Sequence, residues 1–305
     1  MNNGAKTVRP VCVIAGMPRA STTFLYYTLA KHPSCFVPSR KELEFFSINE
    51  ARGQEWYYDF YSAMSDGQVG FDISPLYFFS PDLPEKIKAF FKTPRVILIL
   101  RDPVDFAISF YKNRVGVHGH ELGFEDFISG YSYEKDGSSI ELSIRPGVIR
   151  QQIDSYRERL GDDILLVDFR AMQAVPLDVL TAIEKFCRIP PYFSAENFEN
   201  VRVNASDQVS VQAINKLMHK KWFADLVTTL VPKKLIMAIR YRLQASKRTG
   251  RLPVSEEDEE QYRSLVRRDL AGDAEFMAEI FVDSPFVLGT GKTFCSKIPT
   301  IGSPK

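Results

Sequence analysis

The stretch VCVIAGMPRASTTFLYYTLAKH (residues 11–32) decides the fold. Its first five residues form a continuous apolar run rich in β-branched side chains, which is typical of a strand buried on both faces. The run ends at Gly16, and residues 22–32 have the periodicity of a helix. A buried strand that leads through a glycine loop into a helix predicts a parallel α/β sheet with an anion-binding loop at the carboxyl end of the strand.

The loop GMPRASTT (residues 16–23) differs from the usual phosphate-loop signature G-x-x-x-x-G-K-[ST]. Gly16 and Thr23 fit that signature, whereas Ser21 stands at the second glycine and Thr22 stands at the lysine. The cation of the loop, Arg19, comes before these positions. The loop therefore indicates an anion site that is built differently from a site for the phosphates of ATP.

Strand and helix signals alternate along the chain on both sides of this loop. RVILIL (95–100) and DILLVDF (163–169) are predicted to be buried strands. Helices are predicted at 22–32, 103–113, 148–160, 177–187 and 255–266, the last with Ser255 as its N-cap. This alternation predicts a P-loop-like three-layer α/β fold, in which helices flank a central parallel β-sheet through right-handed crossovers, with a helical C-terminal part.

Composition sets the class of protein. The chain has 305 residues, of which 45% are hydrophobic, so it can bury a sizeable core, and its net charge of +1 excludes no partner. The four cysteines follow neither metal-ligand spacing nor a disulfide framework, and no apolar stretch approaches the ~20 residues of a membrane span. We expect a cytoplasmic enzyme in which residues 1–305 form a single domain with a basic helical insertion at about 209–252.

The insertion itself has an unusual charge balance. Between Ser210 and Leu252 there are ten lysines and arginines against one acid, Asp225, and apolar residues alternate with them at helical spacing. Two interpretations are open. The segment is either a pair of solvated amphipathic helices, or a surface for a polyanion or for peripheral contact with a membrane.

Two loops of the predicted sheet point to the ligand site. The loop at 16–23 follows the first strand, and Arg101 begins the loop RDPVDFAIS after the strand at 95–100. In an open parallel sheet, loops at the carboxyl ends of strands near the switch point form the ligand crevice. Each loop also feeds a helix N-terminus, which favours an anion. The sequence therefore suggests a ligand with two separated phosphate-like groups.

The motifs resemble those of sulfotransferases that use 3′-phosphoadenosine 5′-phosphosulfate (PAPS), in particular bacterial relatives of the Golgi heparan sulfate sulfotransferases. GMPRASTTFL (16–25) resembles the 5′-phosphosulfate loop of that family, and RVILILRDPVDFAISFY (95–111) resembles its 3′-phosphate motif. KELEFF (41–46) and FDISPLYFF (71–79) resemble two further segments of the Golgi-type enzymes. The resemblance covers roughly residues 8–205 and 253–282.

The resemblance implies a donor site and a reaction. The donor site would comprise Arg19, Ala20, Ser21, Thr22, Thr23, Arg101 and Ser109. Backbone N–H groups of residues 20–23 and the two threonine hydroxyls would hold the 5′-phosphate, and Arg101 with Ser109 would hold the 3′-phosphate. PAPS would be the donor and adenosine 3′,5′-bisphosphate the product, with a sulfuryl group passing in line to a hydroxyl or amine of a carbohydrate, a lipid or a small natural product.

Catalytic roles follow from the same resemblance. Arg19 would stabilise the charge that grows on the bridging oxygen of the donor, and Glu42 would take the proton of the acceptor. No metal is expected, because cations and helix N-termini would supply the charge that Mg²⁺ supplies in kinases. No nucleic acid is expected as a partner. The partner is the acceptor, which would be a glycan or a lipid-linked molecule if residues 210–252 dock it.

Three positions depart from the family pattern. Ser21 replaces a loop glycine, Ile73 replaces a lysine, and Glu44 stands where the Golgi-type enzymes often have histidine. Glu44 competes with Glu42 for the role of base. If residues 42–44 are extended, the two carboxylates point the same way and share a site, which would raise the pKa of one of them.

Two other classes of function stay open at this stage. A P-loop kinase or NTPase would share the general fold, although the loop lacks its lysine. A non-catalytic protein that keeps the nucleotide fold would act through the basic residues 210–252 instead. His118 and His120 lie just past the predicted 3′-phosphate helix, either as acceptor or metal contacts or as solvated turn residues.

Overall fold

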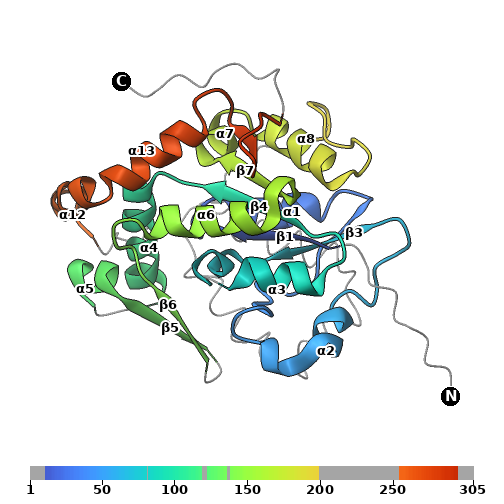
Figure 1. Ribbon diagram of the computed structural model, residues 1–305, viewed down its shortest axis with the longest axis horizontal. Helices are drawn as coiled ribbons and strands as arrows, with labels where there is room; N and C mark the ends of the chain where they lie inside the picture. The colour runs from blue at the N-terminus through green and yellow to red at the C-terminus, as the bar shows by residue number, and fades with distance from the viewer. Residues whose placement is uncertain (1–10, 81, 119–121, 136–137, 199–253, 295–305) are drawn as a thin grey trace.

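A computed structural model of the chain describes residues 11–80, 82–118, 122–135, 138–198 and 254–294 (Figure 1). The predicted basic insertion at 209–252 lies outside these residues, and the assignment of the chain to a single domain stays a prediction. The strands are β1 (Val11–Gly16), β2 (Cys35–Phe36), β3 (Val69–Ile73), β4 (Arg95–Leu100), β5 (Tyr131–Lys135), β6 (Ser138–Leu142), β7 (Ile164–Asp168) and β8 (Phe286–Leu288). The α-helices are α1 (Thr22–Leu29), α2 (Gly53–Asp59), α3 (Leu83–Phe90), α4 (Pro103–His118), α5 (Phe124–Ser129), α6 (Val148–Leu160), α7 (Phe169–Ala174), α8 (Pro176–Cys187), α12 (Glu256–Asp269) and α13 (Ala271–Ile280).

Six strands form one sheet in the order β2-β3-β1-β4-β7-β8. Every neighbouring pair is parallel except β7 and β8, which are antiparallel. Strands β1, β4 and β7 are buried along almost their whole length, as continuous apolar runs in the middle of a parallel sheet must be. The predicted fold class, a parallel α/β sheet flanked by helices, is confirmed.

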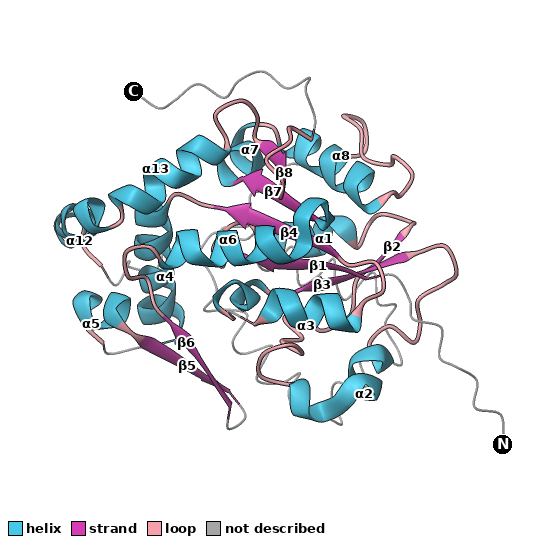
Figure 2. Ribbon diagram, in the orientation of Figure 1, coloured by secondary structure: helices cyan, strands magenta, loops and turns pink. Residues whose placement is uncertain are grey.

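Helices cover both faces of this sheet. In Figure 2, α3 and α6 lie side by side in front of the strands, and two polar contacts join them. The connection from β1 through α1 runs to β2 on one side, whereas those from β3 to β4 and from β4 to β7 run the other way. Because such crossovers are right-handed, α1 lies on the face opposite to α3 and α6. The three layers follow from this reversal.

The reversal also fixes the ligand crevice. Strands β1 and β4 are neighbours, and the chain leaves β1 toward β2 but leaves β4 toward β7. The switch point of the sheet therefore lies between the carboxyl ends of β1 and β4. The loops that begin at Gly16 and Arg101 are the two that flank this point. The sequence predicted this placement.

Most predicted elements are confirmed with small changes at their ends. The strand at 95–100 and the helix at 148–160 have the predicted bounds, whereas the helix predicted at 22–32 ends at Leu29. Ser255 is the N-cap of α12, as predicted, and it also forms a capping box with Asp258. None of the helices in the described ranges is long and apolar enough to cross a membrane.

A buried carboxylate of the C-terminal part contacts the start of α6. Asp273 of α13 is 2% exposed, and its two oxygens accept hydrogen bonds from the N–H groups of Gly147 (2.7 Å) and Arg150 (2.9 Å). These donors belong to the first turn of α6 and have no acceptor within their own helix. Asp273 therefore acts as an N-cap for a helix far away in the sequence.

Candidate active site

The loop after β1 is hydrogen-bonded to β4 at the switch point. The N–H of Met17 donates to the carbonyl oxygen of Ile99 in β4 at 2.7 Å. Gly16 is required where the strand ends, because a Cβ there would lie 2.7 Å from the Cβ of Phe78. The close approach of Phe78 thus explains the one glycine that this loop shares with the phosphate-loop signature.

Two residues of the loop adopt a conformation that normally belongs to glycine. Arg19 has φ 63° and Ser21 has φ 61°, both in the left-handed region. Such a conformation costs roughly 1–2 kcal/mol for a residue with a Cβ. Ser21 therefore adopts a backbone conformation that glycine would adopt at lower cost. Strain of this kind is held in place by its surroundings and concentrates at ligand-binding segments.

The start of α1 offers hydrogen-bond donors. Within the described part of the chain, no group accepts a hydrogen bond from the N–H of Ser21, Thr22 or Thr23. Ala20 differs from the prediction for residues 20–23, because its N–H already donates to the carbonyl oxygen of Met17 at 3.3 Å. No side chain caps the helix either, so the threonine pair is not an N-cap. Three N–H groups at the positive end of a helix, next to two hydroxyls, form a site for an anion.

The two predicted anion loops touch one another. Arg19 Nε donates to the hydroxyl oxygen of Ser109 in α4 at 3.2 Å. Arg101 Nη1 donates to the carbonyl oxygen of Arg19 at 2.8 Å. The structure thus brings together three residues that are up to 90 positions apart.

This cluster gathers positive charge in a partly buried place. Among the residues that the structure describes, neither Arg19 nor Arg101 forms an ion pair with an acid. Burial, together with the charges of Arg101 and Arg114, lowers the pKa of Arg19 to about 10. A site that holds like charges together in a partly buried position is prepared for a multiply charged anion.

Arg114 is a member of the cluster that sequence reasoning missed. It is 7% exposed, and its guanidinium carbon lies 4.9 Å from the ring centroid of Phe110 and 5.7 Å from that of Tyr131. Its position in α4, five residues after Ser109, follows no family motif. An arginine whose neighbours in sequence are "YKNRVG" reads as an ordinary surface cation.

Arg101 is held by its packing. Its guanidinium carbon lies 4.8 Å from the ring centroid of Phe169, at the end of the neighbouring strand β7. Its Nε is buried and has no hydrogen-bond partner among the described residues. Burial lowers the pKa of Arg101, while Asp105 and Asp102 raise it and Arg263 lowers it. Asp102 caps α4 through the N–H groups of residues 104 and 105.

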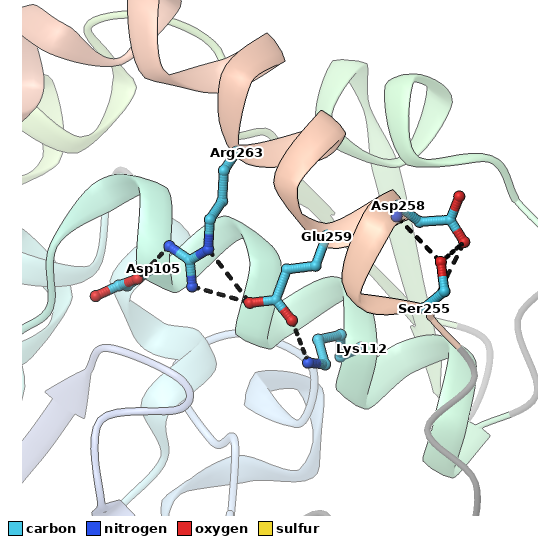
Figure 3. Close-up of polar contacts among 6 residues, drawn as sticks. All are labelled: Asp105, Lys112, Ser255, Asp258, Glu259 and Arg263. Atoms are coloured by element: carbon cyan, nitrogen blue, oxygen red, sulfur yellow. Dashed lines mark hydrogen bonds and ion pairs between the residues drawn. The ribbon is translucent and has the colours of Figure 1, made fainter.

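A charged network holds the neighbouring helix against the site (Figure 3). Arg263 of α12 pairs with Asp105 of α4 at 2.6 Å and with Glu259 of its own helix at 3.0 Å. Glu259 pairs in turn with Lys112 of α4 at 2.6 Å. Because positions 105, 109 and 112 share one face of a helix, α12 lies along the face of α4 that carries Ser109.

The loop with the two candidate bases contradicts the expectation of an extended segment. Glu42 has φ 62° and Glu44 has φ 53°, so both lie in the left-handed region and the two carboxylates do not share an extended face. The side chain of Glu42 is 41% exposed and pairs with Lys41, whereas Glu44 is 0% exposed. The N–H of Glu42 donates to the carbonyl oxygen of Ile73 at 3.2 Å, which places this loop at the carboxyl end of β3, beside β1.

A third acid lies beside this loop, and the sequence did not single it out. Asp72 in β3 is 1% exposed and accepts hydrogen bonds from the hydroxyls of Ser74 (2.6 Å) and Tyr77 (3.1 Å). Burial raises its pKa to about 6, although the hydroxyls of Ser74, Tyr77 and Tyr57 oppose that rise. In the sequence, a single aspartate within "VGFDI" interrupts an apolar run, and nothing else there indicates a functional carboxylate.

The side chains of the two histidines that the sequence singled out lie outside what the structure describes. His120 lies outside the described residues, and His118 ends α4 with a side chain that is not described. Within the described ranges, no three histidine, cysteine, aspartate or glutamate side chains form a group that could hold a metal ion.

Comparison with known proteins found similar sequences and similar solved structures. A bifunctional heparan sulfate N-deacetylase/N-sulfotransferase 4 of Mus musculus is 27% identical over 202 residues, which is 61% of this chain and 23% of that protein. A heparan sulfate glucosamine 3-O-sulfotransferase 5 of Mus musculus is 28% identical over 201 residues, covering 62% of this chain and 56% of that protein. The chain therefore spans about half or less of the length of these relatives. A solved sulfotransferase from Alicyclobacillus acidocaldarius aligns with a TM-score of 0.49 at 18% identity, over 77% of this chain and 99% of that chain.

The family comparison covers more of the sequence. Residues 9–235 of the 305 match the sulfotransferase domain, which is well over half of the chain. This range includes β1 to β7, both anion-binding loops and the loop that carries Glu42. On this match, the chain belongs to the sulfotransferase domain family.

Proposed function

We propose that this protein transfers a sulfuryl group from PAPS to a hydroxyl or amine of an acceptor. The observation that carries the proposal is the arginine cluster at the switch point, where Arg19 contacts Ser109 and Arg101 contacts Arg19, and neither arginine forms an ion pair with an acid among the described residues. PAPS has anionic groups at its 5′ and 3′ positions, so it matches two anion-binding strand ends that face one crevice. Membership of the family supports the same reaction.

Each donor-site residue has a distinct task in this proposal. The open N–H groups of Ser21, Thr22 and Thr23 bind the 5′-phosphate, and Arg101 with Ser109 binds the 3′-phosphate. Arg19 reaches across the crevice between these two sites and stabilises negative charge on the bridging oxygen as the S–O bond breaks. Because sulfuryl transfer resembles phosphoryl transfer, positioning and charge stabilisation account for most of the rate.

The acceptor side depends on Glu42. Its carboxylate is the exposed member of the acidic pair, at the carboxyl end of β3 and beside the strand that leads into the phosphate loop. It takes the proton of the acceptor as the new S–O or S–N bond forms, and adenosine 3′,5′-bisphosphate leaves. Lys41 pairs with Glu42 and keeps its carboxylate at the surface.

Arg101 gives the direct test of the donor site. In Arg101→Ala, we expect the Kd for adenosine 3′,5′-bisphosphate to rise by about 10–100-fold, the scale of a hydrogen bond to a charged group. The Kd for adenosine 5′-monophosphate, which lacks the 3′-phosphate, should rise no more than about threefold. This allowance includes the loss of the hydrogen bond from Arg101 to the carbonyl oxygen of Arg19. Titration calorimetry measures both.

The control for this test is Arg170→Ala. Arg170 follows Phe169 in the sequence and pairs with Asp168 at the carboxyl end of β7. It is therefore a cation at the same edge of the sheet that does not belong to the arginine cluster. Its removal should leave both dissociation constants unchanged. Equal losses for both nucleotides in Arg101→Ala would mean that Arg101 does not bind the 3′-phosphate.

For the acceptor, we propose a carbohydrate, a lipid or a small natural product. The relatives named above act, by their names, on heparan sulfate. Incubation with sulfur-labelled PAPS and a panel of these three classes identifies the class that becomes labelled. Labelling of none of them, with PAPS bound, would contradict the proposed transfer.

We further propose that the basic residues 210–252, outside the described residues, dock this acceptor or an anionic membrane. Ten cations against one acid support an electrostatic attachment, at about 1 kcal/mol for each basic residue near anionic lipid. The protein should sediment with phosphatidylserine vesicles or bind heparin at low salt, and should be released at high salt. A protein that ignores both probes at low salt has no such surface.

A further inference from the structure

The carboxylate of Asp72 is buried at a place where a charge is costly. It lies at the carboxyl end of β3, 1% exposed, and no lysine, arginine or histidine among the described residues forms an ion pair with it. A buried ionised group is retained only when hydrogen bonds compensate the loss of water. The groups that donate hydrogen bonds to Asp72 therefore indicate the role of this carboxylate.

Those neighbours are hydroxyls whose direction the carboxylate sets. An ionised carboxylate only accepts hydrogen bonds, so Ser74 and Tyr77 both turn their single proton toward Asp72. Each hydroxyl oxygen is then left with lone pairs for another donor. Ser74 Oγ accepts from the N–H of Glu44 at 3.2 Å, and the Tyr77 oxygen accepts from the N–H of Phe46 at 3.2 Å.

The backbone N–H groups that donate to these hydroxyls belong to the loop that carries the candidate base, Glu42. In the same loop, the N–H of Glu42 donates to the carbonyl oxygen of Ile73, and Asn49 Nδ2 donates to the carbonyl oxygen of Leu43 at 2.8 Å. Alternate N–H groups at 42, 44 and 46 thus all bond to residues 73–77. The left-handed conformations at 42 and 44 are unfavourable by themselves and depend on such contacts.

We propose that Asp72 is a positioning residue for Glu42. It orients the hydroxyls of Ser74 and Tyr77, and these hold the loop in the conformation that presents the Glu42 carboxylate to the crevice. The inference rests on the proposed function, in which Glu42 takes the proton of the acceptor. Asp72 itself is too deeply buried to contact either substrate.

Hydrogen exchange tests the positioning without any substrate. In Asp72→Asn, the amide NH₂ faces one of the two hydroxyls, and that hydroxyl loses the acceptor for its proton. Amides in the peptide 42–47 should then exchange about tenfold faster or more, while those of β4 keep their protection. Asp162→Asn is the matched control, because Asp162 has an exposed side chain paired with Lys292 and its change should leave the peptide 42–47 unaltered.

Two more variants keep the test decisive if Asp72→Asn unfolds. Ser74→Ala and Tyr77→Phe each remove one receiving hydroxyl and leave Asp72 in place. Each should accelerate exchange in the peptide 42–47 and preserve protection in β4. If the peptide keeps wild-type protection in both of these variants, the hydroxyls do not hold the loop, and the inference is overturned.

Turnover separates a positioning role from a general structural one. With the acceptor that wild-type protein labels most strongly from PAPS, Asp72→Asn should lower kcat by about tenfold or more. The Kd for adenosine 3′,5′-bisphosphate should stay within about twofold, because the donor loops follow β1 and β4. Parallel losses of kcat and nucleotide affinity would refute positioning. If the wild-type protein labels no acceptor, the proposed function is contradicted. The hydrogen-exchange result would still show whether Asp72, Ser74 and Tyr77 hold the loop at 42–47 in place.

Discussion

Arg19→Met is expected to lower the turnover of PAPS by roughly 10²–10³-fold, the usual effect of removing one group that stabilises charge in a transition state. Arg19 is the cation that spans the crevice from the phosphate loop to Ser109 of α4. Methionine has a similar length and no charge, so it keeps the packing and removes the interaction with the bridging oxygen. Single-turnover measurements with saturating PAPS report the chemical step.

The same change should not weaken the fold. Burial and the charges of Arg101 and Arg114 act against the positive charge of Arg19, so its removal relieves repulsion in the protein without donor. We expect the midpoint of thermal unfolding to stay level or to rise by a few degrees. Arg19→Lys keeps a charge and should lose far less activity. A low turnover together with a clearly lowered midpoint would instead indicate a structural role.

Glu42→Gln is expected to lower turnover by about 10²-fold or more, within the range of a general base, and to leave the affinity for adenosine 3′,5′-bisphosphate nearly unchanged. Glutamine keeps the size of the side chain and cannot take a proton. The exposure of Glu42, at 41% of its side chain, lets an acceptor reach the carboxylate. Steady-state rates with labelled PAPS, measured beside nucleotide titrations, separate the two quantities.

Glu44→Gln is the comparison that decides between the two acids. Glu44 is completely buried, so an acceptor cannot reach it in this conformation, and its replacement should affect stability more than turnover. If Glu44→Gln is folded but inactive while Glu42→Gln is active, the base lies two residues further along. If both variants remain active, neither carboxylate takes the proton.

The predictable strands are those whose apolar runs have no interruption. β1, β4 and β7 lie in the middle of the sheet, so both faces of each are buried and the sequence shows it. β3 is equally buried but was not predicted, because Gly70 and Asp72 break its apolar run. A Cβ at Gly70 would lie 2.8 Å from the ring of Tyr61, and Asp72 serves its hydroxyl partners. Tertiary contacts outside the segment set both residues.

The same contrast holds in the site. The resemblance to family motifs pointed to Arg19, Arg101 and Ser109, and the structure brings these three residues together, while their roles stay predictions. The left-handed turn at Glu42 and Glu44 could not be predicted, because residues with a Cβ disfavour it and distant partners at 73–77 impose it. Arg114 joins the cluster through the packing of α4 against Tyr131, which no local pattern encodes.

The strand that closes the sheet has a consequence for how the chain is made. β7 is buried along its whole length, and its outer edge is covered by β8, which comes far later in the sequence and pairs with it in the antiparallel direction. On the ribosome, β1, β3, β4 and β7 can assemble while β8 is still unmade, so an apolar strand edge faces solvent or a chaperone. Nascent chains that pause before Phe286 are thus the species most exposed to aggregation.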